Sequence, residues 1–382
     1  MQAEILHSGF DKLRVTVQAV LPPEVKAKLA LAAETASVVG SDVLFSSGTP
    51  VLKLRKPKGR GFVIDTGPTG ANWYIRDTGE KQTNQPALTV DFGALGLATT
   101  GLDGAETHFR EVMEALKIPY SDHQLRISRT DYAVDFLAPC FVPDRRALLA
   151  PPGTKVTEYT GIEETETHAV GNRVTGLRAG GIANRQLAIY DKREKIIKDG
   201  NLAWLLIWNT RRATSGLCPL DLTDRRQSQV WRFEYRLGSD FLRNRFEIRD
   251  WHDLRSMIGD AYGDALTRMR YCLPSGDSNR SRWPKHLLWA LFEDVLGGNL
   301  AEHRLGVTQR DVIDANWAAK CREFDRQLLG LFVSRAAVSG VAADAFPNFL
   351  ENHSAALLRY SEEHPVDLES RLEKARHKYR WV

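Results

Sequence analysis

Three short segments of the chain alternate apolar and polar residues with a period of two, and this pattern strongly limits how the chain can fold. They are RISRTDYAVDF at 126–136, QLAIYDK at 186–192 and VWRFEYRL at 230–237. Successive side chains of a β-strand point to opposite faces, so each segment is predicted to be a strand with one apolar and one polar face. If the three strands share a sheet, their polar faces form one surface.

This predicted surface combines carboxylates, cations and one tyrosine. It gathers Arg129, Asp131, Asp135, Tyr190, Lys192, Arg232 and Glu234. Mg²⁺ and Mn²⁺ bind carboxylate oxygens, usually from one or two side chains, so Asp131 with Glu234, joined by Asp135, would form a metal site. A phenol is a poor nucleophile at neutral pH, and a nearby metal ion or lysine lowers the cost of activating it. Arginine and lysine on the same face would hold a phosphodiester.

Each segment alone also has a simpler interpretation. Alternating Arg and Glu are typical of a solvated strand face with cross-strand ion pairs. Asp131 and Asp135 equally suit surface or turn-capping positions, and Tyr190 suits a half-buried strand aromatic. The residue types leave both interpretations open.

The rest of the chain predicts an α+β fold. Short extended runs between 43 and 98, separated by Gly and Pro, predict a meander of antiparallel strands, and 104–117 is predicted to be an amphipathic helix. Beyond 250 the apolar residues follow helical spacing. We therefore expect a mostly antiparallel sheet with a few helices over 1–250, and a helical C-terminal region over 251–382.

Composition and missing motifs exclude several classes of protein. No apolar run approaches the roughly 20 residues that cross a bilayer, and the N-terminus lacks the pattern of a secretory signal. The four cysteines lie far apart and fit neither a disulfide framework nor a zinc site, so a cytoplasmic protein without membrane contact is expected. The P-loop, dinucleotide fingerprint, GxSxG elbow and HExxH motifs are all missing from the sequence.

Positive charge is concentrated in the middle of the sequence. Residues 178–250 contain 15 Lys and Arg against 9 Asp and Glu, whereas the whole chain carries a net charge of only +4. Such a block is typical of a surface that binds a polyanion, although an ordinary solvated surface explains the charge equally well.

The ordered combination of the three strands resembles the replication initiation factor family. This family includes rolling-circle plasmid initiators of the Rep-trans type, related phage initiators and relaxases of conjugative elements. Its pattern is roughly R-x-D-x-x-x-D, then I-Y-D/N-K, then R-x-E, matched here by Arg129-Asp131-Asp135, by 189–192 and by Arg232-Glu234. The core of the resemblance covers about 126–240, and the helices beyond 300 take no part in it.

The resemblance implies an enzyme that nicks and rejoins one DNA strand at a specific origin. Tyr190 would become linked to the 5′ phosphate, and Asp131 and Glu234 would bind Mg²⁺ or Mn²⁺. Asp135, Lys192, Arg129 and Arg232 would support the metal site or hold the phosphate. Residues 1–250 would then be the nicking and DNA-binding domain. The implied partners are duplex and single-stranded origin DNA, a host helicase and a second copy of the chain.

Two other functions remain open from the sequence. One is an origin-binding protein on the same scaffold without catalysis. The other is a module that binds single-stranded nucleic acid through aromatic residues, which would need aromatics rather than carboxylates on the polar face.

Overall fold

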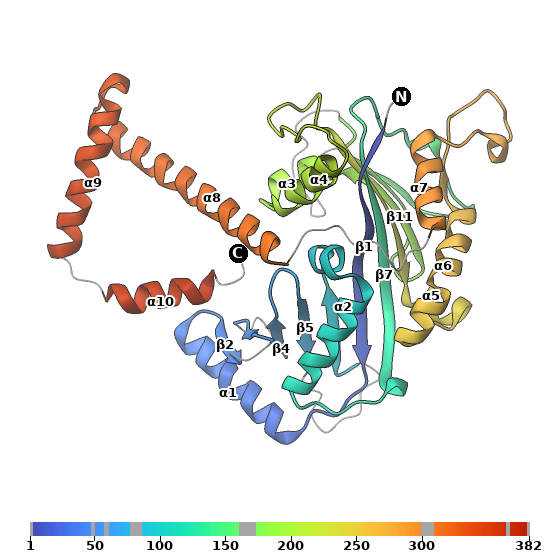
Figure 1. Cartoon of the computed structure of the whole chain (residues 1–382), viewed down its shortest axis with the longest axis horizontal. Coiled ribbons are helices and arrows are strands. Elements are labelled where there is room, and N and C mark those ends of the chain that lie inside the picture. The colour runs from blue at the N-terminus through green and yellow to red at the C-terminus, as the bar shows by residue number, and fades with distance from the viewer. Residues whose placement is uncertain are drawn as a thin grey trace.

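The computed structural model describes residues 3–46, 50–56, 61–76, 86–159, 173–298, 309–363 and 367–379. Within these ranges an eleven-stranded antiparallel sheet forms the centre of the molecule, in the order β2-β3-β4-β5-β6-β1-β7-β12-β11-β10-β9 (Figure 1). The strands of this sheet are β1 (Glu4–Val17), β2 (Val43–Ser46), β3 (Leu52–Leu54), β4 (Phe62–Asp65), β5 (Ala71–Ile75), β6 (Leu88–Phe92), β7 (Leu125–Leu137), β9 (Val156–Tyr159), β10 (Gly176–Gly180), β11 (Arg185–Asp191) and β12 (Val230–Gly238). β8 (Leu148–Leu149) and β13 (Arg270–Tyr271) pair separately.

The helices flank this sheet and continue beyond it. They are α1 (Pro23–Val39), α2 (Ala94–Ala115), α3 (Lys192–Lys198), α4 (Ala203–Thr214), α5 (Ser239–Phe246), α6 (Trp251–Arg268), α7 (Leu287–Gly297), α8 (Gln309–Val338), α9 (Phe346–Glu363) and α10 (Leu368–Lys378). The predicted fold class, α+β with a mostly antiparallel sheet and a helical C-terminal third, is confirmed. The helix predicted over 104–117 is longer, because α2 continues back to Ala94 through a kink at Gly101, whose φ of 67° is left-handed.

The large sheet consists of two halves with the same connectivity. In each half the first strand, β1 or β7, lies at the centre, the last strand, β6 or β12, pairs with it, and the preceding strands follow outwards. β1 and β7 pair antiparallel at the junction of the two halves, with Leu13 opposite Thr130. The sequence shows no repeat, so the halves share connectivity without sharing a pattern of residues.

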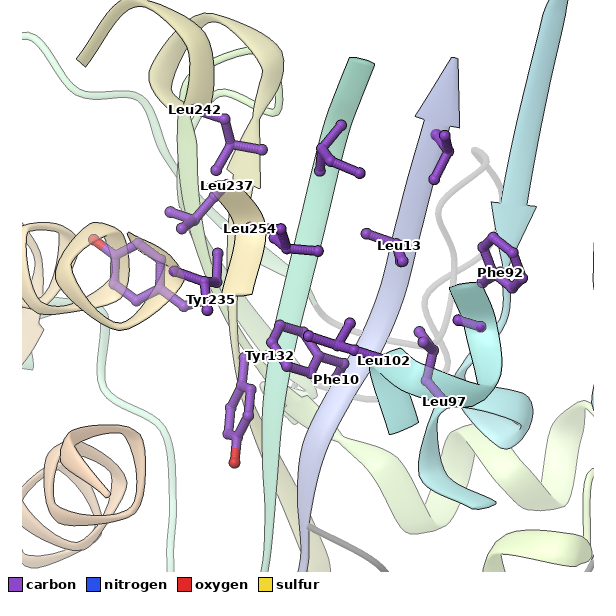
Figure 2. Close-up of a cluster of buried hydrophobic side chains, with 14 of the residues drawn as sticks. Phe10, Leu13, Phe92, Leu97, Leu102, Tyr132, Tyr235, Leu237, Leu242 and Leu254 are labelled. Carbon is purple, nitrogen blue, oxygen red and sulfur yellow. The ribbon is translucent and has the colours of Figure 1, made fainter. Parts of the chain in front are cut away.

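The apolar face of the sheet carries the main core, and helices from both halves cover it. Figure 2 shows Phe10, Leu13, Tyr132 and Leu237 along the strands, with Leu102 of α2 packed against them. Burying one such large apolar side chain contributes about 1.5–3 kcal/mol, so this face supplies most of the stabilisation of the sheet. The period of two in RISRTDYAVDF puts Tyr132 on the face opposite to Asp131, and the structure agrees, since the Tyr132 ring lies 5.8 Å from the Tyr262 ring of α6 in the main core.

The C-terminal third divides into two parts. α6 begins where the carboxylate of Asp250 accepts a hydrogen bond from the Asp253 N–H at 3.0 Å, as an N-cap does. α6 and α7 bury residues in the same core as the sheet, where Phe292 of α7 lies 6.0 Å from Phe233 of β12. In contrast, α8 and α9 extend away from the sheet, and α10 returns toward it (Figure 1), where Lys53 of β3 donates to the Lys378 carbonyl at 3.2 Å. None of the helices in the described ranges has the length and apolar character that crossing a membrane requires.

Candidate active site

The three strands predicted from their alternation are neighbours in the sheet, in the order β7, β12, β11. In this register Arg232 of β12 lies opposite Asp135 of β7 on one side and Tyr190 of β11 on the other. Directly paired residues point to the same face, so the three polar faces coincide as predicted. The opposite, apolar face includes Tyr235, whose hydroxyl donates a 2.7 Å hydrogen bond to the carbonyl of Ala265 in α6.

The charged residues of this face are buried. Arg232 and Asp135 are 0% exposed, Asp131 is 1% exposed and Glu234 is 2% exposed. A solvated face with loose ion pairs, the simpler interpretation of the sequence, is therefore wrong. Burying charges costs several kcal/mol per ion unless each is paired and hydrogen-bonded, so the pairing of every group in this cluster matters.

Arg232 and Asp135 form a closed pair at one end of the face. The Arg232 Nε and Nη2 donate to the two Asp135 carboxylate oxygens at 2.6 and 2.7 Å, and the Trp208 indole of α4 donates to the second oxygen at 2.9 Å. Burial would raise the pKa of Asp135, but the charge and hydrogen bonds of Arg232 outweigh it and lower that pKa. The Trp204 ring of α4 lies 4.3 Å from the Arg232 guanidinium.

The prediction that Asp135 helps to bind a metal does not fit this arrangement. Both of its oxygens are occupied by donors, and the carboxylate is sealed from solvent. Asp135 instead fixes the position of Arg232, and a second carboxylate, Asp11 of β1, pairs with the Arg232 Nη1.

Asp131 and Glu234 are two further buried carboxylates of this face. Arg129 donates to both oxygens of Asp131, at 2.8 and 2.6 Å. The Arg236 Nε donates to Glu234 at 2.7 Å and lies 4.0 Å from Asp131. One guanidinium therefore lies between the two carboxylates.

The two carboxylates differ in their proton affinity. Burial raises the pKa of Asp131 to about 7, and the nearby charge of Glu234 adds to this against the opposing Arg129. Burial would also raise the pKa of Glu234, but Arg236 and the hydroxyl of Tyr190 hold it at about 2. Two neighbouring carboxylates that repel each other in this way provide the oxygen ligands that a shared divalent cation binds. Asp131 and Glu234 thus fit a metal if Arg129 and Arg236 release them. Among the described residues, no group of three or more His, Cys, Asp or Glu side chains is arranged to hold a metal ion.

Tyr190 is half-buried next to this carboxylate pair. Its hydroxyl donates a 2.9 Å hydrogen bond to the Glu234 Oε2. Burial, together with the negative charge of Glu234, raises the pKa of Tyr190 well above its ordinary value. The phenol is therefore protonated at neutral pH, and any reaction at its oxygen needs a route for that proton.

Lys192 belongs to the site, but not as a strand residue. β11 ends at Asp191, whose carboxylate accepts the N–H of Glu194 at 2.9 Å and so caps α3, and Lys192 is the first residue of that helix. The two-residue period that placed Lys192 beside Tyr190 therefore does not continue through this residue. Its ammonium lies 4.3 Å from the Trp204 ring, and burial with the neighbouring Arg232 lowers the pKa of Lys192 to about 8.

Sequence reasoning missed four contributors to the site: Asp11, Trp204, Trp208 and Arg236. Asp11 lies where the β1–β7 register shifts between Phe10 and Lys12, so strict alternation does not predict its direction. The alternation of β12 did place Arg236 on the polar face, and that signal would have been sufficient to include it. No local pattern indicates that α4 closes over one end of the face.

The basic central block does not form one exposed patch. Arg232 is enclosed, Arg236 is paired with Glu234, and buried Arg193 bonds to the Ser228 hydroxyl at 3.0 Å. Part of the positive charge counted in the sequence thus neutralises carboxylates inside the fold.

Comparison with known proteins adds little to this picture. No protein-family model and no curated protein matches the chain. A solved structure of a rolling circle replication initiator protein from Geobacillus stearothermophilus matches with 15% identity and a TM-score of 0.38, over 78% of this chain and 99% of that one. A similarity of this degree assigns neither fold nor activity.

Proposed function

We propose that this chain is a replication initiator that nicks and rejoins one strand of origin DNA through Tyr190, as a rolling-circle initiator or a relaxase does. The observation that carries the proposal is the tyrosine hydroxyl held at 2.9 Å by the buried carboxylate of Glu234, on a face lined by arginines. The ordered sequence pattern of the three strands supports the same assignment.

The proposed chemistry is a transfer of one phosphoester bond. The Tyr190 oxygen forms a bond to the scissile phosphorus, the bond from phosphorus to the 3′ oxygen breaks, and the 5′ phosphate stays on the tyrosine. The proton that the phenol loses is balanced by the proton that the leaving 3′ oxygen takes up. Reversal of the same steps rejoins the strand without an external energy source.

The surrounding residues have distinct parts in this proposal. The hydrogen bond to Glu234 fixes the direction of the Tyr190 oxygen, which an in-line attack requires. Arg129 and Arg236, with 18% and 13% of their side chains exposed, would hold the phosphate in this proposal. A divalent cation bound by Asp131 and Glu234 would withdraw charge from the phosphate.

Arg232 does not contact the phosphate in this proposal, although the sequence pattern suggested that it would. Its guanidinium is sealed between Asp135, Asp11 and the Trp204 ring, so it acts through the position and charge of its neighbours. Lys192 is 5% exposed, and its ammonium adds positive charge at the same end of the face.

The alternative of a module that binds single-stranded nucleic acid only is less well supported. That function would need aromatics in place of Asp131 and Glu234, the carboxylates at the centre of the polar face. A non-catalytic origin-binding protein would keep DNA binding without forming a covalent adduct, so the experiment below separates it from the proposed enzyme.

The test is covalent capture of DNA. The protein is incubated with random-sequence single-stranded DNA labelled at its 3′ end, with Mg²⁺, Mn²⁺ or EDTA, and run on a denaturing gel. We expect a metal-dependent labelled adduct that disappears in Tyr190→Phe, Asp131→Ala and Glu234→Ala and persists in Tyr74→Phe, a partly exposed tyrosine of β5. An adduct retained by Tyr190→Phe, or mapped to another tyrosine, would contradict the assignment.

Partners beyond DNA belong to the same proposal. The sequence resemblance implies a homodimer and recruitment of a host helicase. Sedimentation of the chain with and without the covalently bound strand tests the first, and co-purification of a helicase activity with the adduct tests the second.

A further inference from the structure

Tyr159 and Tyr190 lie on the same face of the sheet with a glycine between them. Gly176 of β10 is paired with Tyr159 of β9 on one side and with Tyr190 of β11 on the other. Because directly paired residues point to the same face, both phenol rings rise from the polar face, and the position between them has no side chain. We propose that these two rings, the tyrosine pair, form a stacking site for one base of a single DNA strand.

The spacing of the strands suits an inserted base. Neighbouring strands lie about 4.7–4.9 Å apart, so residues two strands apart are separated by about 9–10 Å. A base sandwiched between two rings needs about 7–8 Å, since carbon atoms in contact lie about 3.5–4.0 Å apart. The backbone spacing of the tyrosine pair therefore matches the thickness of one inserted aromatic ring.

The glycine at this position is explained by the close approach of β11, and it leaves no side chain between the two rings. Gly176 is absent from the positive-φ glycines of the described chain, so its conformation is open to other residues. A Cβ at this position would lie 3.2 Å from the Tyr190 Cβ and 3.1 Å from the Ile189 carbonyl oxygen. Any larger side chain would therefore crowd Tyr190 and fill the space between the rings.

The charge next to the tyrosine pair matches a nucleotide. The Arg178 guanidinium of β10 lies over the Tyr159 ring, 5.0 Å from its centroid, so a cation already stacks on one face of this ring. A base has a π-face for the rings and a phosphate for the cation, and stacking of this kind tolerates any base sequence. A base inside a duplex is already stacked on both sides, so the site selects single-stranded DNA.

This inference rests on the proposed function, because only a nicking enzyme would use the stacked base to position the scissile phosphate. Since Tyr190 is both one wall of the stacking site and the proposed nucleophile, the bound base belongs to a nucleotide next to the scissile phosphate. Stacking would then hold the strand in register with the Tyr190 oxygen.

The first measurement is the affinity for a fluorescently labelled 20-nucleotide single-stranded DNA, followed by anisotropy. Stacking of one base on an aromatic ring is worth about 5- to 150-fold in affinity, so Tyr159→Ala should weaken binding by that factor. Tyr159→Phe keeps the ring and should bind within about twofold of the wild type. Tyr74→Ala is the matched control, because Tyr74 is a partly exposed tyrosine in the other half of the sheet, and it should bind like the wild type.

The second measurement uses a variant whose new side chain fills the space between the Tyr159 and Tyr190 rings. Gly176→Leu should weaken binding as Tyr159→Ala does, whereas Gly181→Ala, where an added Cβ meets nothing within 4 Å, should not. Circular dichroism checks the folding of both variants, and the Tyr159 series decides the question if Gly176→Leu does not fold. Equal affinities of Tyr159→Ala, Tyr74→Ala and wild type would overturn the proposal.

The two proposals fail in different ways. If the wild type forms no covalent adduct but Tyr159→Ala still loses affinity, the nicking function is wrong and the stacking site stands. If the adduct forms and Tyr159→Ala binds and reacts like the wild type, the stacking site is wrong and the nicking function stands.

Discussion

Replacing Asp135 by alanine tests whether this carboxylate supports Arg232 or binds a metal. The change leaves a guanidinium that is 0% exposed without the two hydrogen bonds of 2.6 and 2.7 Å that it now makes, and leaves the Trp208 indole without its acceptor. Breaking a buried pair by removing one partner costs about 3–5 kcal/mol. Because Asp11 still pairs with Arg232, we expect the lower end, about 3 kcal/mol, in the free energy of unfolding.

The assay is urea unfolding followed by tryptophan fluorescence, carried out once in EDTA and once in Mg²⁺ without EDTA. The double variant Asp135→Leu, Arg232→Met removes both buried charges and should be more stable than Asp135→Ala alone. Arg146→Ala, which breaks an ion pair whose arginine side chain is 81% exposed, is the control and should leave the unfolding midpoint unchanged. A loss below about 1 kcal/mol in EDTA that grows when Mg²⁺ is added would refute the supporting role and restore Asp135 as a ligand.

Three further predictions concern the same face. The pKa of Asp131 is raised to about 7, so the folded state keeps a proton that the unfolded state releases near pH 4. The free energy of unfolding should therefore fall as the pH rises from about 4 to 7. Asp131→Asn should remove this fall, measured as the urea midpoint at each pH. The pKa of Lys192 is lowered to about 8, so its ammonium loses its charge above that pH, and adduct formation should decline there. Lys192→Arg should move this decline to higher pH. An identical pH profile of the two proteins would exclude a role of the Lys192 charge in adduct formation. Trp208→Phe removes the N–H bonded to Asp135 and should lower the free energy of unfolding by about 1.5–3 kcal/mol in urea titrations; an unchanged value would contradict a stabilising role for this hydrogen bond.

Much of the fold and the face of the site follows from local sequence. The period of two in β7, β11 and β12 indicates which residues share a face, because that period is a property of the strand itself. It placed Tyr190 with Glu234 and Asp131, and it placed Tyr132 on the opposite, apolar face.

The pairing of the charges could not be predicted, because it depends on register between strands far apart in sequence. Arg232 reaches Asp135 across 97 positions of sequence, and only the observed register shows that this carboxylate is already occupied. Local exceptions account for two further differences. Asp191 ends its strand by capping α3, which takes Lys192 out of the alternation, and the register shift in β1 turns Asp11 toward the site.

The central position of β1 has a consequence for how the chain folds during synthesis. β1 is made first, yet its two neighbours, β6 and β7, end at Phe92 and Leu137. At about 5–20 residues per second, the ribosome completes β7 roughly 6–24 s after β1, and β1 has no permanent partner during most of that time. Pairings at such long sequence separation also fold slowly. The nascent chain therefore exposes an unpaired apolar strand for seconds, and holding it free of aggregation is a task for a chaperone.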